Sequence, residues 1–159
     1  MVASVYVSFD YEDQRHLQGF ARLKQSLRHP LDFRDHAVVD ADRNESGTPM
    51  VFPPGDPRSQ SVRDAIVAKF AQCSKLVVLI GEETYRSEWV AWEIDTFFAM
   101  KRTTSGDRTW WRIRGMTLRG AMNAIIPQAL NGQSTKAMSW DPEGLDQWLE
   151  LDPDAQQPR

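Results

Sequence analysis

The stretch from Lys75 to Lys101 most constrains the fold, because its hydrophobic pattern changes from that of a strand to that of a helix. It reads KLVVLIG and then EETYRSEWVAWEIDTFFAMK. Before Gly81, an unbroken run of Leu, Val and Ile predicts a strand that is buried on both faces. After the glycine, apolar side chains recur at helical spacing, and Thr84 or Ser87 is available as the N-cap. These helical positions are Val90, Ile94, Phe97 and Phe98.

A strand that leads into a helix places the turn between them at its carboxyl end, where open α/β sheets bind their ligands. On the predicted helix, Trp89 and Glu93 are four residues apart, so the indole and the carboxyl group lie on one face. A carboxyl group beside an aromatic ring at that edge indicates a functional site. The alternative is an ordinary amphipathic helix, in which the Glu is solvated and the Trp belongs to the core.

The pattern LVVLIGEETYRSEWVAWEI resembles the strand, turn and helix of TIR-like domains, in particular the bacterial group typified by the Thoeris anti-phage TIR protein. In TIR domains that cleave NAD, a Trp followed four residues later by a Glu marks the catalytic helix. Trp89 and Glu93 match those two positions. Val90 stands where a Cys often follows the Trp, but that Cys is not the chemical group. The resemblance spans about residues 2–101.

Strands and helices are predicted to alternate over the first half of the chain. The strands are 2–9, 33–39 and 75–80, and the helices are 11–28 and 61–73, the latter with Ser61 and Asp64 at capping-box spacing. Such alternation predicts a parallel sheet with right-handed crossovers. With the resemblance, it leads us to expect an α/β fold: a flavodoxin-like open parallel sheet of about five strands with helices on both faces.

The second half is less regular. Either residues 109–118 or residues 123–127 supply the fourth strand, and the pattern does not decide between them. Residues 135–140 are a candidate fifth strand. Asp141 and Pro142 suit the N-cap and first position of a last helix, which would carry Leu145, Trp148 and Leu149 inward. We expect one domain over residues 1–152 and a frayed tail over residues 153–159.

The turn after the first strand, SFDYED, carries the next candidate site residues. TIR domains open with a strand that ends in a Ser and an aromatic residue, followed by an acidic residue. Ser8, Phe9 and Asp10 occupy those positions, and in the family this loop lines the nucleotide pocket. Phe9 or Tyr11 could join Trp89 in stacking on a nucleotide ring. Without the resemblance, the turn is an ordinary helix cap.

The second predicted strand begins with polar residues. Arg34 and Asp35 could bind an anion or a ribose, and the alternative is a solvated strand edge. The following stretch, from Asp40 to Arg58, contains four prolines and two glycines, so no regular element is expected to run through it. Its apolar tip, residues 50–52, either packs back on the domain or contacts another copy or acts as a lid.

Composition excludes several classes of function. A net charge of −3 argues against a general nucleic-acid binder, which usually carries a basic excess. No apolar run approaches the ~20 residues that span a bilayer, and no secretory signal is visible, so we expect a cytoplasmic protein without membrane contact. The single cysteine, Cys73, and the scattered histidines offer no metal-ligand spacing, so we expect no metal.

The resemblance implies an enzyme that consumes NAD as its substrate and needs no other cofactor. Breaking the nicotinamide–ribose bond develops oxocarbenium character, which a fixed carboxylate stabilises, and Glu93 is the candidate. The product would be ADP-ribose or a cyclic isomer that signals to a separate effector protein in bacterial anti-phage defence, and homo-oligomers would form through TIR–TIR contacts. The alternatives are a non-catalytic TIR-like interaction module and a receptor that binds a nucleotide without cleaving it.

Overall fold

The computed structural model describes residues 4–10, 31–33, 52–131 and 141–151. Within these ranges, four strands form one parallel sheet in the order β2-β1-β3-β4. The strands are β1 (Ser4–Ser8), β2 (Leu31–Phe33), β3 (Cys73–Ile80) and β4 (Ile113–Thr117). This order matches the first four strands of the flavodoxin-like arrangement, so the predicted parallel α/β fold is confirmed. The candidate fifth strand at 135–140 lies outside the described residues.

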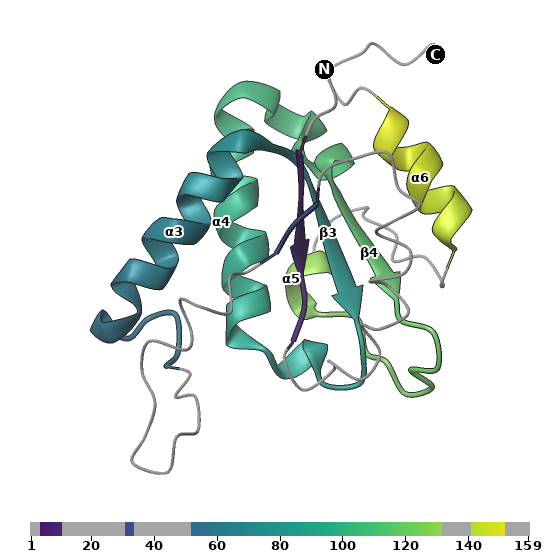
Figure 1. Ribbon diagram of the computed structural model, residues 1–159, viewed down its shortest axis with the longest axis horizontal. Coiled ribbons are helices and arrows are strands. Elements are labelled where there is room, and N and C mark those ends of the chain that lie inside the picture. The colour runs from purple at the N-terminus through teal and green to yellow at the C-terminus, as the bar shows by residue number, and fades with distance from the viewer. Residues whose placement is uncertain (1–3, 11–30, 34–51, 132–140, 152–159) are drawn as a thin grey trace.

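Helices cover both faces of the sheet, as predicted (Figure 1). The helices α3 (Gln60–Gln72) and α4 (Glu88–Ser105) pack on one face, and α6 (Pro142–Glu150) packs on the other. A short helix, α5 (Gln128–Asn131), contacts α4. In the described part of the chain, no helix is both long and apolar enough to cross a membrane. The helix predicted over residues 11–28 and the tail at 153–159 lie outside the described residues.

Alternation along the strands divides the core into two clusters. Tyr6 of β1 faces α3 and α4, where it packs edge to face on Phe70 with 4.8 Å between the ring centroids. Val5 and Val7 face α6. All three side chains are fully buried, so the central strand is covered on both sides, as its continuous apolar pattern requires. The burial of β3 follows the same rule.

Several predicted element boundaries were wrong. The third strand starts at Cys73 rather than Lys75, so Cys73 belongs to β3 and not to the helix predicted over residues 61–73. The second strand starts at Leu31 rather than Phe33, because pairing with β1 begins opposite Val5; residues 34–39 lie outside the described part. Helix α3 starts at Gln60, so Ser61 lies inside it and does not cap it. Ser59 stands at the N-cap, but its hydroxyl donates to the Pro53 carbonyl instead.

The fourth strand comes from the first of the two candidate segments. Residues 113–117 form β4, and the 3₁₀ segment η4 (Gly106–Arg112) precedes it. Arg112 ends that segment with hydrogen bonds to the Ser105 hydroxyl at 2.8 Å and the Ser74 carbonyl at 3.0 Å. Residues 124–127 have no regular structure and lead into α5. Of the two arginines in this candidate segment, Arg112 therefore belongs to the connection and Arg114 to the strand.

A buried lysine fixes helix α6 against the sheet. Asp141 caps the helix by accepting from the Gly144 amide at 3.0 Å, and Leu145, Trp148 and Leu149 point inward, as predicted. Lys75 of β3 is only 3% exposed. Its ammonium donates to three carbonyls at the carboxyl end of α6, those of Trp148 (2.5 Å), Leu149 (3.0 Å) and Leu151 (2.6 Å). A cation at this end also interacts favourably with the helix dipole.

Replacing Lys75 with Met should lower the free energy of unfolding by about 2 kcal/mol, because methionine keeps the apolar stem but donates no hydrogen bond to the three carbonyls. Part of this loss is offset, because the variant does not have to remove a charged ammonium group from water. Urea denaturation followed by far-UV circular dichroism measures the change. The exposed Arg119→Met variant is the control for loss of one positive charge, and equal stability of the two variants would contradict the assigned role.

Candidate functional site

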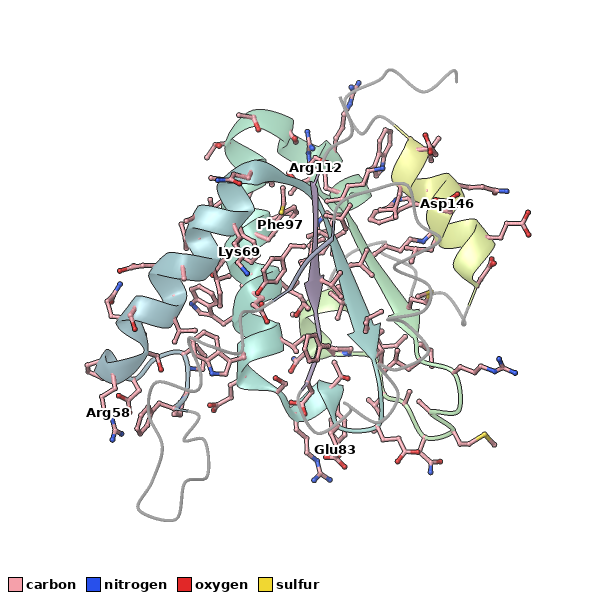
Figure 2. All side chains as sticks on the ribbon, in the orientation of Figure 1. Arg58, Lys69, Glu83, Phe97, Arg112 and Asp146 are labelled. Carbon is pink, nitrogen blue, oxygen red and sulfur yellow. The ribbon has the colours of Figure 1, made fainter. Side chains whose placement is uncertain are left out.

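The candidate site lies at the carboxyl edge of the sheet, between β1 and β3. In this strand order the chain turns to opposite sides of β1, and ligands of open α/β sheets bind in the crevice at that point. The turn after β3 lies at this edge, and Figure 2 shows Glu83 there, at the opposite end of the molecule from Arg112. The edge is therefore where the predicted residues of the first turn and of helix α4 can meet.

Ser8 and Glu93 meet at this edge. Ser8 is the last residue of β1 and lies two positions after Tyr6, so its side chain faces α4. Its hydroxyl donates a hydrogen bond to Oε1 of Glu93 at 3.1 Å. Neither residue has exposed surface. The structure thus brings together the two predicted residues that are farthest apart in sequence, and it places the carboxyl group inside the domain rather than on a solvated helix face.

The turn between β3 and α4 sets the position of the helix that carries Glu93. Thr84, in the 3₁₀ turn η3 (Thr84–Arg86), is fully buried; its hydroxyl accepts from the Gly81 amide at 2.8 Å and donates to the Leu79 carbonyl at 3.3 Å. Ser87 is the N-cap of α4 and accepts from the Val90 amide at 3.2 Å. Of the two N-cap candidates, Ser87 is therefore correct, and Thr84 fastens the turn to its own strand.

Trp89 lies one turn before Glu93 and is only 7% exposed. Its indole N–H donates to the Phe52 carbonyl at 2.8 Å. Its ring packs edge to face on Trp92, with 5.7 Å between the centroids. Phe52 thus packs back on the domain, which is one of the alternatives considered for the loop tip; residues 50 and 51 lie outside the described residues. No feature of the sequence indicated this contact, because Phe52 and Trp89 are 37 positions apart.

The segment around Phe52 is held by charged side chains. The Arg58 guanidinium lies 3.6 Å from the centroid of the Phe52 ring. Asp56 pairs with Arg58 at 2.7 Å and accepts from its backbone amide at 2.8 Å. These side-chain and backbone hydrogen bonds of Arg58 lower the pKa of Asp56 to about 2. Both members of the pair are therefore charged at neutral pH.

The remaining predicted site residues are not all near Glu93. Phe9 is buried in the cluster that packs on α6, which is the face of the sheet opposite to Glu93. Asp10 is half-buried at the end of β1. Tyr11, Arg34 and Asp35 lie outside the described residues. Substrate binding by these residues stays a prediction. Within the described ranges, no group of three or more His, Cys, Asp or Glu side chains could hold a metal ion.

The segment after β4 forms another border of this edge. The Leu118 amide donates to the Ile80 carbonyl at 2.9 Å, so the segment begins beside the end of β3. Three of its apolar residues are exposed: Met122, Ile125 and Ile126. Sequence reasoning gave this segment no role in the site, because residues 123–127 were considered only as a strand.

Comparison with protein families shows which family the chain belongs to. The family described as "Thoeris protein ThsB, TIR-like domain" is matched over residues 6–106. The chain belongs to this family. The match covers the end of β1 and all of β3 and α4, and thus both partners of the Ser8–Glu93 hydrogen bond. Trp89 and Glu93 both lie within the residues matched by this ThsB TIR-like family.

A likeness to a solved structure supports the fold of this ThsB-type TIR-like chain. The 2-deoxyribosyltransferase from the psychrotolerant bacterium Bacillus psychrosaccharolyticus superposes with a TM-score of 0.55 and 14% sequence identity. The alignment covers 94% of this chain and 93% of that chain. At this identity the likeness shows a shared fold only. Comparison with curated protein sequences finds no significant match.

Replacing Ser87 with Ala should lower the free energy of unfolding by about 1 kcal/mol, because the Val90 amide loses its capping acceptor. Ser87→Asp is the matched control, since Asp also caps and its charge suits a helix N-terminus, and it should keep stability within about 0.5 kcal/mol. Thermal denaturation of the three proteins checks this. Equal destabilisation by Ala and Asp would show that the cap does not hold α4.

Replacing Ser8 with Ala should lower the free energy of unfolding by about 1–3 kcal/mol, because a buried carboxyl group loses a hydrogen-bond donor. The same change should cost less than about 0.5 kcal/mol in a Glu93→Ala background, where the acceptor is absent. Urea denaturation of the four proteins gives the coupling energy. A coupling of zero would mean that the 3.1 Å contact contributes nothing to stability.

Proposed function

We propose that this TIR-like chain cleaves the nicotinamide–ribose bond of NAD, with Glu93 as the catalytic carboxylate. The observation that carries the proposal is the burial of Glu93 against Ser8 at the ligand edge of the sheet. Helix carboxylates are almost never fully buried unless a partner compensates them, and buried ionisable groups concentrate at functional sites. Membership of the ThsB TIR-like family supports the same reading.

The reaction is a substitution at the ribose carbon that bears nicotinamide. When the bond breaks, its electron pair leaves with nicotinamide, which becomes neutral, and positive charge develops on the ribose. A carboxylate held in a dry site stabilises that charge more strongly than a carboxylate in water. Water then adds and loses a proton to give ADP-ribose. An internal hydroxyl or ring nitrogen of the same molecule gives a cyclic isomer instead.

Burial of Glu93 sets a condition on this mechanism. The carboxyl group has no exposed surface, so the ribose can meet it only after the groups that cover it move aside. The free energy for that movement must come from substrate binding or from an earlier step such as assembly with other copies. We therefore propose that the protein has low basal activity. We also propose that it assembles through TIR–TIR contacts in the cytoplasm, and that its product acts on a separate effector in anti-phage defence.

One observation favours the second candidate, a non-catalytic interaction module. Met122, Ile125 and Ile126 are exposed by 88%, 51% and 40%, and all three belong to the segment after β4. Large exposed apolar surfaces are typical of protein contact sites, and this segment offers three apolar side chains to one. An interaction module needs this surface and has no use for a buried Glu93, whereas the enzyme needs both the carboxyl group and access to it.

Replacing Glu93 with Gln should lower the rate of nicotinamide release from NAD by at least about 100-fold, because the neutral amide cannot stabilise the developing charge. Glutamine can still accept from Ser8, so the fold should be kept. Chromatography of nicotinamide and mass spectrometry of the second product measure the reaction and distinguish ADP-ribose from a cyclic isomer.

Glu88→Gln is the matched control for this test. Glu88 lies on the same helix, in its first turn, but its side chain is exposed, so the variant loses the same charge away from the ribose. It should release nicotinamide at the wild-type rate. If wild type and Glu93→Gln release nicotinamide equally at high protein concentration, the enzymatic proposal is wrong. Self-association without turnover would then identify the interaction module.

A further inference from the structure

The indole of Trp89 is built into the domain, and it offers no open face to a ligand. The side chain is 7% exposed, and the rings of Trp89 and Trp92 pack edge to face on each other. The ring also belongs to the core cluster that contains Ile66 and Val90. A nicotinamide or adenine ring that stacked on Trp89 would have to displace this packing. The polar atom of the side chain, by contrast, is already used, because Nε1 donates to the Phe52 carbonyl.

The partner of that hydrogen bond belongs to a well-braced segment, residues 52–59. The Ser59 hydroxyl donates to the Pro53 carbonyl at 2.8 Å and lies 3.4 Å from the Phe52 carbonyl oxygen. The Arg63 guanidinium donates to the carbonyls of Pro54 and Asp56. Figure 2 shows Arg58 beside the start of α3. Its guanidinium lies over the Phe52 ring, so the two ends of the segment contact each other. The acceptor for Trp89 is therefore fixed to α3 and not to a free loop.

The hydrogen bond acts on the helix one turn before Glu93. Thr84 fastens the turn before α4 to β3, and Ser87 caps the helix. The Trp89 bond is a further restraint, because it joins the first turn of α4 to Phe52 and so resists rotation of that turn about the helix axis. Rotation there would carry the Glu93 carboxyl group away from Ser8. Displacement by about 1 Å of a group that acts in a reaction can cost a factor of 100 in rate.

We propose that Trp89 is a positioning residue whose indole N–H, rather than its ring face, serves the reaction, by holding α4 against residues 52–59 so that Glu93 stays in register with Ser8. This inference rests on the proposed NAD cleavage. It assigns Trp89 a different role from the stacking partner expected from the sequence. The two roles differ in one atom, because stacking needs the ring and positioning needs the hydrogen on Nε1.

The test replaces Trp89 with β-(3-benzothienyl)alanine, which keeps the shape and stacking surface of tryptophan but has sulfur where the N–H was. Site-specific incorporation leaves the other five tryptophans unchanged. Positioning predicts that kcat for NAD falls about tenfold or more while KM stays within about twofold, because only an interaction that orients the reacting group is lost. Stacking predicts wild-type kinetics for this variant and a raised KM for Trp89→Leu.

Two controls separate positioning from general loss of packing. Trp92→Phe removes an indole that packs on Trp89 but leaves the Trp89–Phe52 hydrogen bond, and its kcat should stay within about threefold of wild type. Ser59→Ala loosens the acceptor segment without touching Trp89 or Glu93, and it should lower kcat in the same direction as the benzothienyl variant. Wild-type kcat in the benzothienyl variant, or an equal loss in Trp92→Phe, would overturn the inference.

A separate measurement keeps the inference testable if the wild-type protein does not turn over NAD, in which case the proposed function itself fails. Amide hydrogen exchange of residues 88–95 reports local opening of the first turns of α4. The benzothienyl variant should exchange faster there, by about tenfold, while the amides of β3 keep their wild-type rates. Unchanged exchange at residues 88–95 would show that the indole N–H does not hold the helix.

Discussion

The hydrogen bond from Ser8 to Glu93 joins two elements that are 85 residues apart in sequence, and the arrangement of the site depends on it. It can form only if β1 presents Ser8 to the α4 face and α4 presents Glu93 to the sheet. The first condition follows from the two-residue period of the strand, because Tyr6 and Ser8 share a face. The second follows from the start of the helix at Glu88, which the Ser87 cap sets. A shift of one residue in either element would separate the two side chains.

The parts of this arrangement that could be predicted are those whose signals are local. The change of period at Gly81 located β3 and α4, and the Asp141–Pro142 pair located α6, because strand runs and caps are short-range patterns. The fourth strand could not be chosen, because its neighbouring Trp and Arg residues fit both a strand and a connection. Arg112 bonds to Ser105 and Ser74, which lie 7 and 38 positions away from it in the sequence. Hydrophobic periodicity does not predict such contacts.

The site was predicted in part, for the same reason. Ser8, Trp89 and Glu93 were found through a resemblance that covers the first two thirds of the chain, and the structure joins Ser8 to Glu93 directly. Phe9 was placed with them because TIR domains carry an aromatic residue after that Ser, yet alternation sends its side chain to the α6 face. The N–H of Trp89 was missed, since the spacing of two residues on one helix says nothing about a carbonyl on a distant segment.

The family match and the likeness to a solved structure cover different lengths of the chain. The match ends at residue 106. After it, β4 adds a strand to the sheet, and the helices α5 and α6 complete its cover. Lys75 connects the two parts, because it is in β3 but its ammonium holds the carboxyl end of α6. Helix α6 buries the face of the sheet opposite to Glu93, so β1 and β3 are packed on both sides. A carboxyl group can be kept in a fixed place at the end of these strands only if the strands themselves cannot move, and the segment beyond the family match supplies that restraint.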